Sequence, residues 1–128
     1  MTMKAKILIV EDDTSVAMMM ARLLERAGCD VRVADTGEQG LELALVNRFD
    51  LITLDVDLPG MTGLGILQEL RQRHISRRTP IVMISGRATE EDRQHALELG
   101  ATDYITKPFP AVDLIYRIMS HVTERVVA

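Results

Sequence analysis

Residues 51–60 read LITLDVDLPG, and this stretch decides the fold. An apolar run ends in Asp55, and Asp57 follows shortly before a proline and a glycine. A short, nearly continuous apolar run bounded by turn residues is typical of a strand buried on both faces of a parallel sheet. Such a strand delivers the two carboxylates to the carboxyl edge of the sheet, where parallel α/β proteins form their sites.

Similar apolar runs recur on both sides of this stretch. The predicted strands cover residues 6–10, 31–34, 51–55, 80–85 and 103–106. The segments between and after them carry apolar residues at helical spacing. Thr36 and Thr89 stand where two of these helices would be capped, and Gly28 and Gly100 stand where two would end. Five strands alternating with five helices predict an α/β fold with a doubly wound, five-stranded parallel sheet.

The composition limits the function. The 128 residues, 47% hydrophobic and 27% charged, fit one soluble domain, and no run approaches the roughly 18 apolar residues of a membrane span. The N-terminus lacks a signal-peptide pattern, so we expect a cytoplasmic protein. The net charge of −4 argues against nucleic acid as a partner, and we interpret residues 71–78 (RQRHISRR) as a solvated helix end and loop. Cys29, the single cysteine, is expected in the core.

Polar residues stand at the ends of four predicted strands. They are Glu11, Asp12 and Asp13 after the first strand, Asp55 at the end of the third, Ser85 at the end of the fourth, and Lys107 after the fifth. Parallel strands open on one edge of the sheet, so these side chains should meet there. Neighbouring carboxylates repel by roughly 4 kcal/mol per pair at an effective dielectric near 20, and a hard cation such as Mg²⁺ offsets this repulsion. A cation, a lysine and a hydroxyl around Asp55 predict a phosphoryl-transfer site with Asp55 as the nucleophile.

Four stretches together resemble the receiver domain of the bacterial two-component response regulators, of the kind found in chemotaxis regulators. They are ILIVEDD, LDVDLPGMTG, PIVMISG and GATDYITKPF, and the resemblance runs from residue 4 to about residue 124. It implies a flavodoxin-like (βα)5 fold, a single receiver domain over residues 1–128, and no output domain in this chain. It also implies a phosphorylation-activated switch, which catalyses its own Mg²⁺-dependent aspartyl phosphorylation and dephosphorylation without being a conventional enzyme.

The resemblance assigns roles to individual residues. Asp55 corresponds to the phospho-acceptor. The metal ligands correspond to Glu11, Asp12, Asp55 and the main-chain carbonyl of Asp57, for Mg²⁺ or, as a substitute, Mn²⁺. Lys107 corresponds to the lysine that contacts the acyl phosphate. Asp13 is interpreted as a lead-in residue of the first helix, with a ligand role as the alternative.

The resemblance also implies how the switch moves. Ser85 and Tyr104 correspond to the switch hydroxyl and the switch aromatic, and the bond between Lys107 and Pro108 is cis in the family. On phosphorylation Ser85 would move toward the phosphoryl group, and Tyr104 would turn from an exposed to a buried position. This rearrangement would change the face made by the fourth helix, the fifth strand and the fifth helix.

Asp57 and Arg87 are candidates for tuning the reaction rate. The family pattern does not require the side chain of Asp57, which we expect at the mouth of the pocket with Arg87 across from it. The hypothesis is that the two side chains pair or compete there and set the lifetime of the phosphorylated state. The alternative is two solvated side chains.

Two other functions compete with a phosphorylated switch. A D-x-D motif also occurs in haloacid-dehalogenase-type phosphatases, but there it follows the first strand, and here Leu58 and Pro59 follow it instead of the usual residues. The second alternative is a pseudo-receiver that is not phosphorylated and acts as a protein-interaction module.

The resemblance also indicates partners. The phosphoryl donor would be a sensor histidine kinase or a histidine phosphotransfer protein, and the output an effector protein or a fused output domain. No direct contact with nucleic acid or membrane is expected. Asp103 and Arg117 fit the charge pattern of receivers that dimerise, whereas Thr102, Thr123 and Glu124 depart from it. We therefore expect a monomer or a weak, phosphorylation-dependent dimer.

Overall fold

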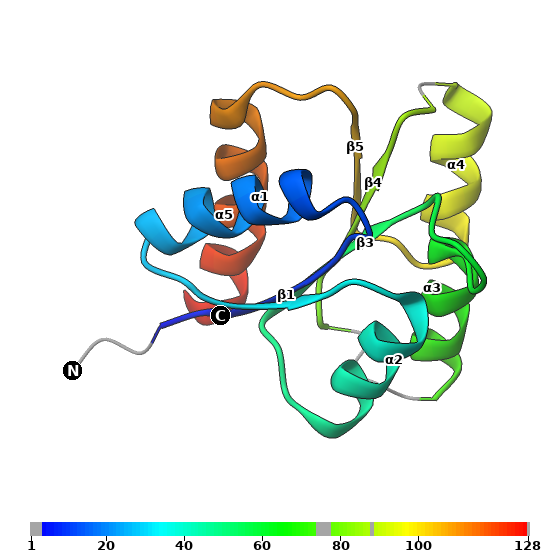
Figure 1. Ribbon diagram of the computed structural model, residues 1–128, viewed down its shortest axis with the longest axis horizontal. Helices are drawn as coiled ribbons and strands as arrows, with labels where there is room; N and C mark the ends of the chain where they lie inside the picture. Colours follow the sequence, from blue (N-terminus) through cyan, green and yellow to red (C-terminus); the bar gives the residue numbers. More distant parts are fainter. Residues whose placement is uncertain (1–3, 74–77, 88, 128) are drawn as a thin grey trace.

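The computed structural model describes residues 4–73, 78–87 and 89–127 (Figure 1). The strands are β1 (Lys6–Val10), β2 (Asp30–Ala34), β3 (Leu51–Asp55), β4 (Ile81–Ser85) and β5 (Asp103–Thr106). The helices are α1 (Thr14–Arg26), α2 (Gly37–Val46), α3 (Gly63–Gln72), α4 (Glu90–Glu98) and α5 (Ala111–Val127). The strands pair in parallel in the order β2-β1-β3-β4-β5, which confirms the predicted doubly wound, flavodoxin-like fold.

Helices cover both faces of the sheet. Figure 1 shows α1 and α5 on one side, and α2, α3 and α4 on the other. Successive side chains of a strand point to opposite faces, so Ile7 and Ile9 pack in the cluster with α1 and α5, whereas Leu8 and Val10 pack in the other. The central strands are therefore apolar almost throughout, apart from Lys6 at the start of β1 and Thr53 within β3, and their carboxylates stand at or just after the carboxyl edge.

Side-chain caps start the helices where the sequence predicts them. Asp13 is the N-cap of α1 and accepts a hydrogen bond from the Val16 amide at 3.2 Å, in agreement with its lead-in interpretation. Thr36 caps α2 and Thr89 caps α4 in the same way. These caps place the first turns of α1 and α4 close to the carboxyl edge of the sheet, because each helix follows its strand after a short loop.

The interpretation of Arg71 as a solvated residue is wrong. Its Nε donates to the Gly100 carbonyl at 3.0 Å, and its Nη1 donates to the Thr79 carbonyl at 3.0 Å. Burial lowers the pKa of the guanidinium. Arg71 thus joins the end of α3 to the turn before β5, while residues 74–77 of the same stretch lie outside the described residues.

Cys29 is buried, as predicted for a core residue. Among the helices that the structure describes, none combines the length and the apolar character needed to cross a membrane.

Candidate functional site

Three carboxylates converge where β1 and β3 end. Val10 pairs with Leu54, so the residues that follow, Glu11, Asp12 and Asp55, lie together. One carboxylate oxygen from each lies within 4.8 Å of the others. Glu11 and Asp55 are 2% and 5% exposed, whereas Asp12 is open to solvent. We call Glu11, Asp12 and Asp55 the acidic pocket.

The loop after β3 folds back tightly against Asp55. The Gly63 amide donates to the Val56 carbonyl at 3.1 Å, and the Asp57 amide donates to Asp55 Oδ1 at 3.2 Å. A Cβ atom at Gly63 would collide with the Asp55 carbonyl oxygen, so a glycine is needed for α3 to begin this close to the strand. The loop therefore fixes the backbone of Asp55 and holds one oxygen of its carboxylate.

Lys107 brings a positive charge into the acidic pocket. Its Nζ lies 2.7 Å from Glu11 Oε1 and 3.3 Å from Asp55 Oδ2. Its backbone amide donates to the Ser85 carbonyl at 2.7 Å, and the peptide bond to Pro108 is cis, as the family resemblance implies. Lys107 thus bridges the carboxylates of β1 and β3 from the far side of β4.

The charges of the pocket do not balance. Burial and the neighbouring Asp55 raise the pKa of Glu11 to about 7, although Lys107 acts in the opposite direction. Burial disfavours the charged form of Lys107 too, but the carboxylates of Glu11 and Asp55 outweigh it and raise the pKa of the ammonium. Burial is the largest cause of the Glu11 shift, and the two carboxylates that share a single lysine add to it.

The residues of the pocket fit a hard divalent cation. Three carboxylate oxygens within 4.8 Å of one another are the donor type that Mg²⁺ prefers, and the exposed Asp12 leaves a route from solvent. A cation would also offset the repulsion by Asp55, which adds to burial in raising the pKa of Glu11. The sequence-predicted ligands Glu11, Asp12 and Asp55 are therefore together in space.

Ser85 and Tyr104 both contact the backbone of Arg87. Ser85 is fully buried, and its Oγ accepts a hydrogen bond from the Arg87 amide at 3.0 Å. Tyr104 is 4% exposed, and its hydroxyl donates to the Arg87 carbonyl at 3.0 Å. The structure therefore holds Tyr104 in the buried one of the two positions that the sequence analysis considers.

The side chains of Asp57 and Arg87 approach each other as the sequence predicts. Arg87 Nη2 lies 3.8 Å from Asp57 Oδ1, and the two side chains are 66% and 53% exposed. An ion pair this long and this exposed contributes little to stability.

Sequence reasoning named Asp103 and Arg117 but missed their contact with each other and with His121. Asp103, at the start of β5, contacts Arg117 and His121 of α5 within the same chain. Arg117 and His121 are four residues apart and share one face of the helix, which is the signal that could have found them. Asp103 and Arg117, which fit the dimer pattern in the sequence, are thus engaged with each other inside the chain. The side chains of Thr123 and Glu124 lie outside the described part.

The comparisons with known sequences agree on one family. Residues 7–119 match the response regulator receiver domain. The transcriptional regulatory protein CpxR of Escherichia coli (strain K12) is 45% identical over 113 residues, which cover 88% of this chain and 47% of that protein. The transcriptional regulatory protein DltR of Streptococcus agalactiae serotype III (strain NEM316) is 40% identical over 113 residues, 88% of this chain and 50% of that protein. The chain thus spans about half the length of these curated relatives.

Solved structures give the same answer for the fold. The receiver domain of the Francisella response regulator 1452 superposes with a TM-score of 0.90 at 31% identity, over 94% of this chain and 98% of that chain. The chemotaxis response regulator CheY4 of Vibrio cholerae superposes with a TM-score of 0.88 at 33% identity, over 93% of this chain and 99% of that chain. The match thus covers nearly the whole length of both neighbours.

Proposed function

The chain belongs to the response regulator receiver domain family of two-component signal transduction, and we propose that it is a switch activated by phosphorylation of Asp55. The observation that carries this proposal is the acidic pocket with Lys107 bridging it. Asp55 has one oxygen held by the Asp57 amide and the other near the ammonium of Lys107, which orients the carboxylate for attack.

In the proposed reaction, an oxygen of Asp55 attacks the phosphorus of a phosphohistidine on the donor protein. A P–O bond forms, the P–N bond breaks, and the imidazole nitrogen leaves with the electron pair of that bond. Dephosphorylation is attack by water on the same phosphorus, which releases inorganic phosphate and restores the carboxylate. Lys107 would hold a phosphoryl oxygen through its ammonium, and Ser85 would donate its hydroxyl to another.

The acidic pocket would also hold the Mg²⁺ on which the reaction depends. Glu11, Asp12 and Asp55 are the side chains proposed as ligands, the main-chain carbonyl of Asp57 is a further one, and Mn²⁺ would substitute. When bound, the cation would neutralise negative charge on the phosphoryl oxygens. The excess of carboxylates over Lys107 supports this assignment.

The switch would pass through the backbone of Arg87. Phosphorylation adds charge and acceptor oxygens at Asp55, which would draw the hydroxyl of Ser85 away from the Arg87 amide. Tyr104 is bonded to the carbonyl of the same residue, so a change at Ser85 reaches it through the loop after β4. We propose the buried Tyr104 as the activated arrangement, and the face of α4, β5 and α5 as the surface that a partner reads.

The partners are proposed from family membership. The donor would be a sensor histidine kinase or a histidine phosphotransfer protein. The relatives CpxR and DltR are named transcriptional regulatory proteins and are about twice as long, which supports an output domain or an effector protein as the reader of the switch. Asp57 and Arg87 are proposed to set how long the phosphorylated state lasts.

Phosphorylation in the test tube tests the proposal. The protein is incubated with Mg²⁺ and acetyl phosphate, and its intact mass is recorded beside those of the Asp55→Asn and Asp57→Asn variants. We expect an adduct of one phosphoryl group in the wild type and in Asp57→Asn, because only the backbone of Asp57 is needed. The adduct should be absent from Asp55→Asn and from a sample with chelator. A wild type that gains no Mg²⁺-dependent adduct would favour the pseudo-receiver, in which the surface alone acts.

A further inference from the structure

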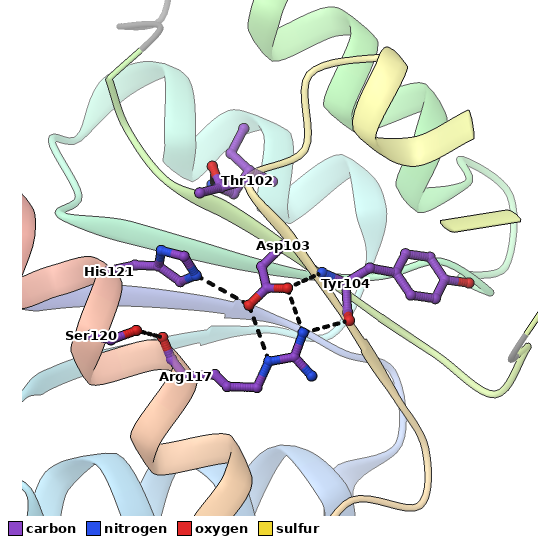
Figure 2. Close-up of polar contacts among 7 residues, drawn as sticks. Thr102, Asp103, Tyr104, Arg117, Ser120 and His121 are labelled. Atoms are coloured by element: carbon purple, nitrogen blue, oxygen red, sulfur yellow. Dashed lines mark hydrogen bonds and ion pairs between the residues drawn. The ribbon is translucent and has the colours of Figure 1, made fainter. Parts of the chain in front are cut away.

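Asp103 is the centre of a charged cluster that joins β5 to α5 (Figure 2). Its Oδ2 accepts from Arg117 Nε at 3.1 Å and lies 3.1 Å from His121 Nε2, and its Oδ1 contacts Arg117 Nη2. The side chain of Asp103 is 15% exposed, and those of His121 and Arg117 are 22% and 33% exposed. We call Asp103, Arg117 and His121 the β5–α5 cluster.

This cluster also holds the backbone of Tyr104. The Tyr104 amide donates to Asp103 Oδ1 at 2.8 Å, and the Tyr104 carbonyl accepts from Arg117 Nη2 at 3.0 Å. β5 is the last strand of the sheet, and the outer side of an edge strand has no neighbouring strand to pair with. Two side chains take the place of that missing strand at Tyr104, so the position of its backbone depends on them.

Tyr104 is therefore tied on two sides. Figure 2 shows the tyrosine ring pointing away from Arg117 and Asp103, across the strand. On that side its hydroxyl donates to the Arg87 carbonyl, and the amide of the same arginine donates to Ser85 Oγ. One residue thus links the loop beside the acidic pocket to the helix at the outer face.

We propose that Arg117 and His121 are positioning residues of the switch: through Asp103 they hold Tyr104 in its buried position and join it to α5. Arg117 supplies the forked geometry, because its guanidinium reaches the Asp103 carboxylate and the Tyr104 carbonyl together. His121 braces the carboxylate from the next turn of the helix. The reading of Tyr104 as a switch rests on the proposed function, whereas the hold on its ring can be measured without phosphorylation.

The tyrosine content of the chain makes this measurement direct. The sequence has two tyrosines and no tryptophan, and the second tyrosine, Tyr116, is 74% exposed. Labelling with 3-fluorotyrosine therefore gives two ¹⁹F signals, and a Tyr116→Phe variant assigns the one from Tyr104. The signal of Tyr116 marks where an exposed ring resonates.

The first experiment compares Arg117→Ala and Arg117→Lys with Ser120→Ala in the unphosphorylated protein. Ser120 lies on the same helix and bonds only to the Arg117 carbonyl among the contacts that the structure gives it, so it is the matched control. In Arg117→Ala we expect the exposed population of the Tyr104 ring to rise about tenfold, as loss of charge-assisted hydrogen bonds predicts. Its ¹⁹F signal should move toward that of Tyr116. Lysine keeps the charge but not the fork, so Arg117→Lys should give a smaller shift in the same direction.

The second experiment measures coupling by a double-mutant cycle. The affinity for beryllofluoride with Mg²⁺ is determined for Arg117→Ala, His121→Ala, Tyr104→Ala and the two pairs with Tyr104→Ala. When Tyr104 is present, Arg117→Ala and His121→Ala should each weaken beryllofluoride binding severalfold. In the Tyr104→Ala background, neither change should weaken binding further. An effect that persists without Tyr104 overturns the proposal, because it would show that the two residues act only on general stability.

The outcomes separate the two proposals. A wild type that binds no beryllofluoride contradicts the phosphorylation switch but leaves the ¹⁹F test of the cluster intact. A wild type that binds, with a Tyr104 signal that does not move in folded Arg117→Ala or Arg117→Lys, contradicts the positioning role alone. Circular dichroism confirms that each variant is folded, and Arg117→Lys serves if the alanine variant is not.

Discussion

Glu11 and Asp103 are both carboxylates that lie mostly out of solvent beside a cationic side chain, yet their surroundings act on them in opposite directions. Burial and, to a lesser extent, the neighbouring Asp55 raise the pKa of Glu11 to about 7, and Lys107, which also contacts Asp55, only partly offsets them. Burial acts in the same sense on Asp103, but hydrogen bonds from Arg117, His121 and the Tyr104 amide outweigh it and lower the pKa.

The difference distinguishes a site that is suited to a ligand, the acidic pocket, from a contact that stabilises the fold, the β5–α5 cluster. The acidic pocket keeps repulsion between carboxylates in the folded state, and a bound cation would relieve it. In the β5–α5 cluster, the Asp103 carboxylate is hydrogen-bonded and charge-paired within the chain, so it does not need a ligand to stabilise its charge. The contributions of Glu11 and Asp103 to the free energy of unfolding should therefore depend on pH with opposite signs.

The largest expected effect is on the pH dependence of stability in the metal-free protein, and Glu11→Gln tests it. Because the pKa of Glu11 is raised from 4.5 to about 7, the folded state binds more protons than the unfolded state between these values, and stability falls as pH rises through that window. The fall should approach about 3 kcal/mol, at 1.4 kcal/mol per pKa unit. Urea unfolding at pH 5 and pH 8 in the presence of chelator measures it.

Glutamine at position 11 should remove most of this pH dependence and at the same time weaken Mg²⁺ binding, because it removes the repulsion and the ligand together. The exposed Glu25 on α1 offers the control Glu25→Gln, which should follow the wild type. Equal pH dependence in the wild type and Glu11→Gln would show that the pKa of Glu11 is not raised in the folded state.

The next effect is a loss of stability in Arg117→Ala. The change leaves the Asp103 carboxylate and the Tyr104 carbonyl without their main donor, so the free energy of unfolding should fall by about 2 kcal/mol. Chemical unfolding at neutral pH checks it. The exposed Arg93→Ala on α4 should stay within about 0.5 kcal/mol of the wild type, and a loss as small as that in Arg117→Ala would contradict the role given to the cluster.

A smaller effect of opposite pH sign is expected at Asp103. Its pKa is lowered in the folded state, so its contribution to stability is present above the unfolded pKa near 3.8 and is lost as pH falls below that value. Asp103→Asn should therefore differ from the wild type by about 1 kcal/mol at pH 6 and by less at pH 3. Unfolding curves that keep the same separation at both pH values would rule out the charged carboxylate as the cause.

The sequence predicts the fold and the acidic pocket for the same physical reason. Buried parallel strands are nearly pure apolar runs, so the first charged residues after them, such as Glu11 and Asp55, stand out and must share one edge. Asp13 and Thr36 are found equally well, because a cap acts within three residues of its own position.

Contacts between distant elements could not be predicted in this way. Arg71 reaches two carbonyls that are 8 and 29 residues away, and nothing in its local charge run distinguishes it from a solvated arginine. His121 meets Asp103 only because α5 packs beside β5. The position of Tyr104 depends on a hydrogen bond to the Arg87 carbonyl, and the sequence does not show the path of that loop.

The smallest expected effect concerns the mouth of the acidic pocket. The pair between Arg87 and Asp57 is long and exposed, so breaking it should leave stability within about 0.5 kcal/mol. Its effect should appear in the lifetime of the phosphorylated state. In Asp57→Asn, Arg87 is free to attract the phosphoryl group, and the lifetime should lengthen about two- to fivefold, which corresponds to less than 1 kcal/mol.

Arg87→Ala removes that attraction, so the lifetime should shorten by a similar factor, and the double variant should resemble Arg87→Ala. Decay of the phosphoryl adduct after removal of acetyl phosphate measures all three. The pair Arg73–Glu69 at the end of α3 is also exposed, with a contact of 3.0 Å, and Glu69→Gln therefore serves as a matched control that should not change the decay. If Asp57→Asn decays like Glu69→Gln, the two residues at the mouth are solvated side chains without influence on the reaction.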